Sequence, residues 1–265
     1  MTRDLGELGP IAARKLREAE TLHCASAGLW TKAESLPAAR DLPPTLRGGA
    51  VNAEMKRRSP SGGELRSDLD CGALAVEYAS AGAAAVSVLT DGPGFGGSLA
   101  DLAEVRAAVD LPLLRKDFTV DPVQVAEARV AGADWVLLIV SLLEGGLLDE
   151  CMEAVERAHS HAIVEVHDED ETARAVAAGA ACIGINNRDL RTLRCDVSTF
   201  ARLRRLVPNH VVCVAESGIR DTDTAERLVS EGADAVLIGE ALMRAGSPED
   251  MCAAMVAAAR GAVRR

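Results

Sequence analysis

The chain has 265 residues, of which 48% are hydrophobic, and this apolar content excludes a disordered protein. Its length allows one large domain or two small ones. With 40 acidic residues against 29 Lys and Arg, the net charge of −11 argues against a nucleic-acid-binding protein, but it allows a local positive pocket for a small anion.

The first 45 residues precede a regular pattern of helices and strands. Residues 11–24 look helical, and residues 36–49, with three prolines and two glycines, look like a connecting loop. We therefore predict an N-terminal helical extension and linker over residues 1–45, and a catalytic domain over residues 46–265.

An internal repeat organises the second part. Four times, a helical stretch ends in a small-Gly-Ala turn that is followed by a short apolar run, at Gly82, Gly132, Gly179 and Gly232. Glycine ends helices because it adopts the left-handed conformation at little cost. The runs after these turns, residues 84–89, 135–140, 182–185 and 235–238, are predicted strands.

Four more apolar runs lie between them, at residues 50–55, 113–115, 162–166 and 211–215. The predicted helices lie near residues 69–81, 99–109, 121–131, 147–159, 169–178, 197–206, 221–231 and 248–259. Eight strands that alternate with helices favour an α/β fold, a parallel (β/α)8 TIM barrel. A doubly wound open sheet is the alternative, but the fourfold repeat favours closure.

Several of these strands end in ionisable residues, although a barrel strand should be apolar. The first contains Glu54, which shares a face with Lys56 at a spacing of about 7 Å. The third runs into Lys116, the fifth delivers Glu165 and the seventh delivers Glu216. The carboxyl ends of barrel strands surround the active site, and alternate strands supply one layer, so we expect these side chains to converge. Buried charges are costly unless they are paired or used, so the alternative, scattered surface residues, is less favoured.

Two glycine turns predict a phosphate site. Residues 216–218 end the seventh strand, and Gly239 and Glu240 follow the eighth, before a short helical piece over residues 241–243. Exposed N–H groups after strands seven and eight form the usual phosphate seat of this fold, whereas each glycine alone would be an ordinary loop residue.

No apolar run is long enough for a membrane span, and the N-terminus lacks the pattern of a signal peptide. The seven cysteines are scattered and form no C-x-x-C pair, so we expect reduced cysteines in a cytoplasmic protein.

His159 and His161 lack a third ligand nearby, and no metal site is predicted. Residues 167–170 are interpreted as a helix start, with acids favoured by the helix dipole.

Seven motifs occur in order between residues 51 and 243: residues 54–61 (EMKRRSPS), 95–99 (FGGSL), 114–118 (LRKDF), 164–167 (VEVH), 185–190 (INNRDL), 215–218 (AESG) and 237–239 (LIG). Together they resemble the indole-3-glycerol phosphate synthase family of tryptophan biosynthesis. The resemblance implies a lyase that acts on 1-(o-carboxyphenylamino)-1-deoxyribulose 5-phosphate by ring closure, decarboxylation and dehydration. It implies no metal and no organic cofactor. We expect a small anionic phosphate as the ligand, no nucleic-acid or membrane partner, and a monomer or weak homo-oligomer.

By resemblance, Lys116 is the acid that protonates the substrate carbonyl, and Lys56 pairs with the substrate carboxylate or shares proton delivery. Glu165 matches the family's base, and Glu54 is a second carboxylate in reach. A positioned general acid or base typically raises the reaction rate by ~10²–10⁴-fold. Lysine acts as an acid near neutral pH if burial or neighbouring cations lower its pKa.

The remaining matches concern substrate binding. Asn186 and Arg188 match residues that hold polar groups, and Arg188 could grip the carboxylate. Glu216 matches a partner of the sugar hydroxyls or of a lysine. The phosphate seat is assigned to Ser59, Ser217, Gly218, Gly239 and Glu240, and the slot for the aryl ring to Phe95, Phe118 and Leu190.

Two departures from the family pattern concern the pocket. Asn52 stands where an aliphatic residue is usual and faces inward with Glu54, where its amide needs hydrogen-bond partners. Glu240 replaces a Ser or Thr of many relatives, so we expect its carboxylate to turn away from a phosphate while its backbone N–H points inward. These departures are compatible with a relative that acts on a substituted substrate in a specialised pathway.

Two further alternatives lie in other functional classes. A sugar-phosphate isomerase like phosphoribosylanthranilate isomerase would need a Cys/Asp pair at strands one and five, which is absent. A non-catalytic barrel would not be expected to retain Glu54, Lys56, Lys116 and Glu165.

Overall fold

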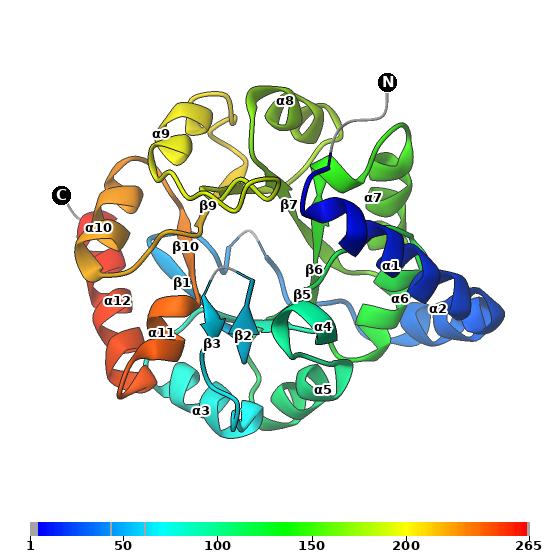
Figure 1. The fold of residues 1–265 in the computed structure, drawn as a ribbon, viewed down its shortest axis with the longest axis horizontal. Coiled ribbons are helices and arrows are strands. Elements are labelled where there is room, and N and C mark those ends of the chain that lie inside the picture. The colour runs from blue at the N-terminus through cyan, green and yellow to red at the C-terminus, as the bar shows by residue number, and fades with distance from the viewer. Residues whose placement is uncertain (1–4, 43, 61, 264–265) are drawn as a thin grey trace.

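The computed structural model describes residues 5–42, 44–60 and 62–263, so residues 1–4 of the predicted extension and Ser61 of the first motif lie outside the described residues. Eight parallel strands close into a barrel in which the first strand pairs with the last (Figure 1). They are β1 (Ala50–Met55), β4 (Ala85–Leu89), β5 (Leu113–Lys116), β6 (Trp135–Ile139), β7 (His161–Val166), β8 (Cys182–Asn186), β9 (Val212–Glu216) and β10 (Ala235–Ile238). The predicted TIM barrel is confirmed, and the open sheet is excluded.

Helices cover the outside of the barrel. They are α3 (Cys71–Ser80), α5 (Leu99–Ala108), α6 (Val123–Val130), α7 (Leu147–Arg157), α8 (Glu169–Ala177), α9 (Ser198–Arg204), α10 (Thr222–Ser230) and α12 (Pro248–Val263). Several begin at a side-chain cap: Asp70, Ser98, Asp168 and Asp221 each accept a hydrogen bond from a backbone N–H of the first turn. All eight predicted helices are therefore present, with ends that differ by a few residues.

The repeated glycines have the predicted conformation. Gly82, Gly132, Gly179 and Gly232 have φ values of 88°, 103°, 76° and 104°. Each turn leads into the barrel strand that follows it, which is why the repeat in the sequence counts alternate strands.

The N-terminal part differs from the prediction. It contains α1 (Leu8–Leu22), a 3-10 turn η1 (His23–Ala25) and a second helix α2 (Ser26–Ser35), whereas the sequence predicted one helix over residues 11–24. Gly28 and the β-branched Thr31 weaken the local helix signal of α2. Tertiary packing supplies its stability, because Trp30 and Ala33 are buried in the core and α2 contacts α6.

Further short elements lie in the loops that follow strands. A hairpin of β2 (Arg58–Ser59) and β3 (Gly63–Glu64) follows β1, and in Figure 1 it is drawn across the middle of the barrel. Its strands are too short to give a periodic signal in the sequence. Helix α4 (Gly92–Phe95) follows β4, and α11 (Glu240–Arg244) is the short helix predicted after the eighth barrel strand.

The core has two layers because side chains alternate along each strand. Val51, Ala53 and Met55 of β1 pack outward with the helices, while Ala50 belongs to the cluster inside the barrel. That inner cluster contains Leu114, Leu137, Ile163, Val214 and Leu237, together with Leu8 of α1. Apolar side chains therefore fill the inside of the barrel. Because Leu8 packs on them, α1 lies at one end of the barrel, next to the strand ends that carry charged residues.

Candidate active site

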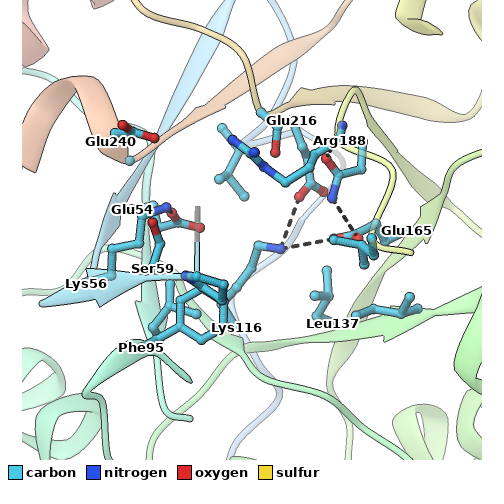
Figure 2. A pocket seen from close by; sticks show the side chains of 18 of the residues that line it. Glu54, Lys56, Ser59, Phe95, Lys116, Leu137, Glu165, Arg188, Glu216 and Glu240 are labelled. Atoms are coloured by element: carbon cyan, nitrogen blue, oxygen red, sulfur yellow. Dashed lines mark hydrogen bonds and ion pairs between the residues drawn. The ribbon is translucent and has the colours of Figure 1, made fainter. Parts of the chain in front are cut away.

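Charged side chains from four alternate barrel strands line one cavity at the carboxyl ends of the strands. Lys116 Nζ lies 3.0 Å from Glu165 Oε2 and 3.2 Å from Glu216 Oε2, while Lys56 is ion-paired with Glu54. Figure 2 shows the Lys116 ammonium directed to Glu165 and Glu216, with Glu54 and Lys56 on the other side. We call Glu54, Lys56, Lys116, Glu165 and Glu216 the charge ring. Its members meet as the sequence predicted.

The cavity brings together every predicted site residue. Its lining includes the charge ring, the polar and phosphate-seat residues, and the aromatic slot, namely Ser59, Phe95, Phe118, Asn186, Arg188, Leu190, Ser217, Gly218, Gly239 and Glu240. The lining also includes Leu8 and Ile11 of α1 and Glu7, which precedes this helix, and the sequence did not single out these residues. The role of each residue remains a prediction at this point.

Glu165 is held by three partners and is 1% exposed. Asn186 Nδ2 donates a hydrogen bond to Oε1 at 2.9 Å, and His167 Nε2 forms an ion-pair contact with the same oxygen at 3.1 Å. Burial raises the pKa of Glu165, but Lys116, His167 and Asn186 outweigh it and hold the pKa well below its usual range. This carboxylate is therefore ionised at neutral pH.

Glu216 has the opposite character. Burial, reinforced by Glu165 and Glu54 and opposed by Lys116, raises the pKa of Glu216 to about 8. Apart from the ion pair with Lys116, neither of its oxygens has a hydrogen-bond partner among the described residues. A carboxyl group in this state still carries a proton near neutral pH.

The condition under which a lysine acts as an acid near neutral pH, a pKa lowered by burial or neighbouring cations, is not met at Lys116. Burial does lower it, but the carboxylates of Glu165, Glu216 and Glu54 outweigh burial and raise the pKa well above its usual range. The sequence indicated that acids and ammonium groups pair here, but it did not indicate how many carboxylates surround the Lys116 ammonium group.

Two glycines make room for the carboxylates of the ring. A Cβ at Gly184 would overlap Glu216 Oε1, and a Cβ at Gly239 would overlap Glu54 Oε1. Gly239, assigned to the phosphate seat, therefore also borders Glu54. A glycine inside a strand is a known sign of close approach, and Gly184 in β8 could have been identified in this way.

The predicted phosphate seat lies beside this ring. Ser217 and Gly218 follow β9 with φ values of 64° and 77°, and the left-handed conformation of Ser217 costs roughly 1–2 kcal/mol. Asn187 braces this turn because its Nδ2 donates to the Ser217 carbonyl at 3.1 Å. Across the seat, the Ser59 hydroxyl accepts a hydrogen bond from Gly62 N–H at 2.9 Å.

Glu240 and Arg188 lie at the rim. Arg244 Nε donates to Glu240 Oε1 at 3.0 Å, and Glu240 still lines the cavity, so its turn away from the seat stays a prediction. Arg188 donates from Nη1 to the Leu193 carbonyl at 2.9 Å, and its backbone N–H donates to Asn186 Oδ1 at 2.9 Å. These bonds tie Arg188 to the end of β8 and to the loop that follows it.

An apolar wall completes the cavity. The rings of Phe95 and Phe118 lie 6.1 Å apart between centroids, within the range of favourable aromatic pairs, and Leu190 packs with the same cluster. Leu8 and Ile11 extend this wall from α1. The wall is suited to a flat apolar ring.

Helix α1 is fixed above the cavity by a second set of buried charges. Lys15 Nζ lies 2.7 Å from Asp117 and 3.2 Å from Asp91, Arg14 lies 2.7 Å from Asp91, and Arg115 lies 3.1 Å from Asp117. We call these five residues the docking cluster. The sequence did not reveal it, because Lys15 on an amphipathic helix looks like an ordinary solvent-exposed lysine.

Neither a metal site nor a membrane helix is found in the part of the chain that the structure describes. Residues 5–42, 44–60 and 62–263 contain no group of three His, Cys, Asp or Glu side chains placed to bind a metal. None of the helices among them combines the length and apolar character that crossing a bilayer requires.

Residues 10–255 match the protein family described as Indole-3-glycerol phosphate synthase. The chain is 51% identical over 245 residues to the Indole-3-glycerol phosphate synthase of Parafrankia sp., covering 92% of this chain and 90% of that one. It is 55% identical over 212 residues to that of Nocardioides sp. (79% and 82%), and 50% identical over 222 residues to Indole-3-glycerol phosphate synthase 1 of Streptomyces coelicolor (83% and 82%).

A solved structure shares the fold. The thiamine phosphate pyrophosphorylase from Pyrococcus furiosus superposes with a TM-score of 0.62 at 17% identity, covering 82% of this chain and 98% of that one. At this identity the likeness concerns the barrel alone.

Proposed function

Because this chain belongs to the indole-3-glycerol phosphate synthase family, we propose that its charge ring closes the indole ring of indole-3-glycerol phosphate. Members of this family are carboxy-lyases of tryptophan biosynthesis. The substrate is 1-(o-carboxyphenylamino)-1-deoxyribulose 5-phosphate, and the products are indole-3-glycerol phosphate, carbon dioxide and water.

The cavity suits both ends of this substrate. The turn at Ser217 and Gly218, opposite Ser59, receives the phosphate, and the wall of Phe95 and Phe118 receives the aryl ring. The substrate carboxylate then lies near Arg188 or Lys56, whose cationic groups line the same cavity. This orientation places the ketose carbonyl between the two walls, where the charge ring lies.

Ring closure needs an acid. The ring carbon that bears the carboxylate attacks the ketose carbonyl, and Lys116 gives a proton to the oxygen that becomes a hydroxyl. The forming alkoxide is far more basic than an amine, so a lysine of raised pKa still serves. The bond to the carboxyl group then breaks, its electron pair restores the aromatic ring, and carbon dioxide leaves.

Dehydration needs a base and a second proton. Glu165 takes a proton from the carbon next to the nitrogen, while the hydroxyl leaves as water with a proton from Lys116. Glu216, whose pKa is about 8, returns the first proton to Lys116 between the two steps. Because the substrate carboxylate leaves as neutral carbon dioxide, each turnover takes up one proton from solution.

One observation carries this proposal: a single ammonium group, Lys116 Nζ, lies 3.0 Å from Glu165 Oε2 and 3.2 Å from Glu216 Oε2, in a site where burial raises the pKa of Glu216 to about 8. An acid, a base and a proton reserve therefore meet at one atom. Groups of unequal pKa at contact distance are typical of acid–base sites.

The purified chain, mixed with the substrate, tests the proposal. We expect indole fluorescence and carbon dioxide to appear at equal rates. A folded chain that binds the substrate without releasing either product would contradict the proposal and favour a non-catalytic barrel. Turnover restricted to a ring-substituted substrate would favour the specialised relative instead.

A further inference from the structure

His167 is a buried, charged neighbour of Glu165 that the reaction above does not use. It follows β7 two residues after Glu165, so alternation brings both side chains to the same side of the chain. His167 Nε2 lies 3.1 Å from Glu165 Oε1, and its Nδ1 shares a hydrogen bond of 2.9 Å with Glu171 Oε2. The His167 side chain is 10% exposed.

The partners of Glu165 divide between its two oxygens. Asn186 donates a hydrogen bond to Oε1 at 2.9 Å, and His167 Nε2 lies 3.1 Å from the same oxygen as an ion-pair contact without hydrogen-bond alignment, whereas Lys116 donates to Oε2 at 3.0 Å. Of these partners, Lys116 is the one that the reaction draws toward the substrate oxygen. When its ammonium turns to the substrate, Oε2 is released while Oε1 stays fixed.

We propose that His167, held by Glu171, is a positioning residue that keeps Glu165 ionised and oriented so that Oε2 acts as the base. This inference rests on the proposed function, because it assigns a support to the proposed base. Glu165 must stay unprotonated after Lys116 has turned away, and the imidazolium is the cation that remains at contact distance.

The surroundings of His167 support a charged imidazole. Burial lowers the pKa of His167, but the carboxylates of Glu165 in β7 and Glu171 in α8 outweigh it and raise the pKa to about 9. Among the described residues, these two carboxylates are the charged groups in ion-pair contact with the ring. The contact with Glu171 also fixes the ring, because the His167 backbone N–H donates to Glu171 Oε2 at 2.8 Å.

The pH dependence of kcat in His167→Gln tests the proposal. Glutamine keeps a donor but lacks the charge, so Glu165 takes up a proton more readily in the substrate complex. We expect the acid limb of kcat to move to higher pH by about one unit. Glu169→Gln is the matched control. Glu169 is an exposed acid that pairs with Arg202 and lies in α8, the helix of Glu171, so this change should leave the acid limb of kcat unmoved. An unmoved limb in a folded His167→Gln protein would overturn the proposal.

A histidine titration followed by NMR keeps the proposal testable if that variant does not fold. In the unaltered protein, one of the five imidazoles should titrate near pH 9, and Glu171→Gln should lower that midpoint. A His167 midpoint at or below the ordinary 6.5 would overturn the proposal. An unaltered protein without turnover would instead contradict the proposed function, while the titration would still decide whether His167 pairs with Glu165.

Discussion

Lys116 and Asp117 are consecutive residues that belong to two buried charge clusters of opposite character. In the charge ring, one ammonium lies between Glu165 and Glu216, and the pKa of Glu216 is raised to about 8. In the docking cluster, Lys15 and Arg115 both contact Asp117. Burial raises the pKa of Asp117, but these cations outweigh it and lower the pKa to about 2.

The difference teaches how one fold uses buried charge for two purposes. The docking cluster matches its carboxylates with cations and Thr90, whose hydroxyl donates to Asp117 at 2.6 Å, so it fixes α1 and the loops after β4 and β5. The charge ring contains three carboxyl groups and two ammonium groups, and this imbalance suits the proton transfer that we propose. Three substitutions in the two clusters separate these purposes, a fourth concerns a buried residue outside both, and they follow in order of expected effect.

The largest effect is expected for Lys116→Met, which removes the shared ammonium from the charge ring. The loss of a positioned acid should lower kcat by about 10³-fold, which is about 4 kcal/mol of transition-state stabilisation. Substrate binding should remain measurable, because the phosphate seat and the aromatic wall are unaltered. Fluorescence turnover and a binding titration measure the two effects. Lys32→Met, an exposed lysine of α2, is the control, and near-normal turnover of Lys116→Met would refute the assignment.

The corresponding change in the docking cluster is Lys15→Met. It leaves Asp91 and Asp117 short of a cation in a buried site, which should lower the free energy of unfolding by about 3 kcal/mol. KM should rise because Leu8 and Ile11 lose their fixed position, whereas kcat should change little. Urea unfolding and steady-state kinetics measure these effects. A large fall in kcat with unaltered stability would contradict the division between the two clusters.

Glu216→Gln should change activity and stability in opposite directions. The folded-state pKa of about 8 lies above the ordinary 4.5, so the stability that this group contributes at low pH is lost as the pH rises through about 8. A neutral amide avoids this loss, and we expect the variant to be about 2 kcal/mol more stable at pH 9. Turnover should fall because the proton reserve is lost. The free energies of unfolding of Glu216→Gln and of the unaltered protein are compared at pH 5 and pH 9. An equal pH dependence in the two proteins would contradict the raised pKa of Glu216.

The smallest effect concerns Asn52, which is 0% exposed inside the barrel. Neither polar atom of its amide has a hydrogen-bond partner among the described residues. Asn52→Leu removes this unpaired group and should raise the free energy of unfolding by about 1 kcal/mol, with turnover nearly unchanged. A destabilised variant would show that the amide is satisfied, for example by an internal water molecule.

Much of the fold followed from local sequence signals. The glycine of each repeated turn ends a helix before a strand, so the repeat predicted the barrel and its strand order. The charge ring was predictable because a charged residue at the carboxyl end of an apolar barrel strand lies at the active-site face of this fold. Helix α2 escaped prediction because packing of Trp30, rather than local propensity, holds it.

Interactions between distant segments account for what the sequence did not show. Lys15 meets Asp117 through the docking of α1 on the barrel, and no local pattern encodes that contact. The direction of the Lys116 pKa shift depends on how many carboxylates surround its ammonium group, which only coordinates reveal. His167 could have been found by alternation from Glu165, but the helix cap at Asp168 offered a sufficient explanation for the segment.

Infrared difference spectroscopy on the unaltered protein tests most directly whether the charge ring holds a carboxyl group that keeps its proton at neutral pH. We predict a protonated carboxyl band that disappears with a midpoint near pH 8 and is missing from Glu216→Gln. Complete ionisation of every carboxyl group by pH 6 would contradict the account.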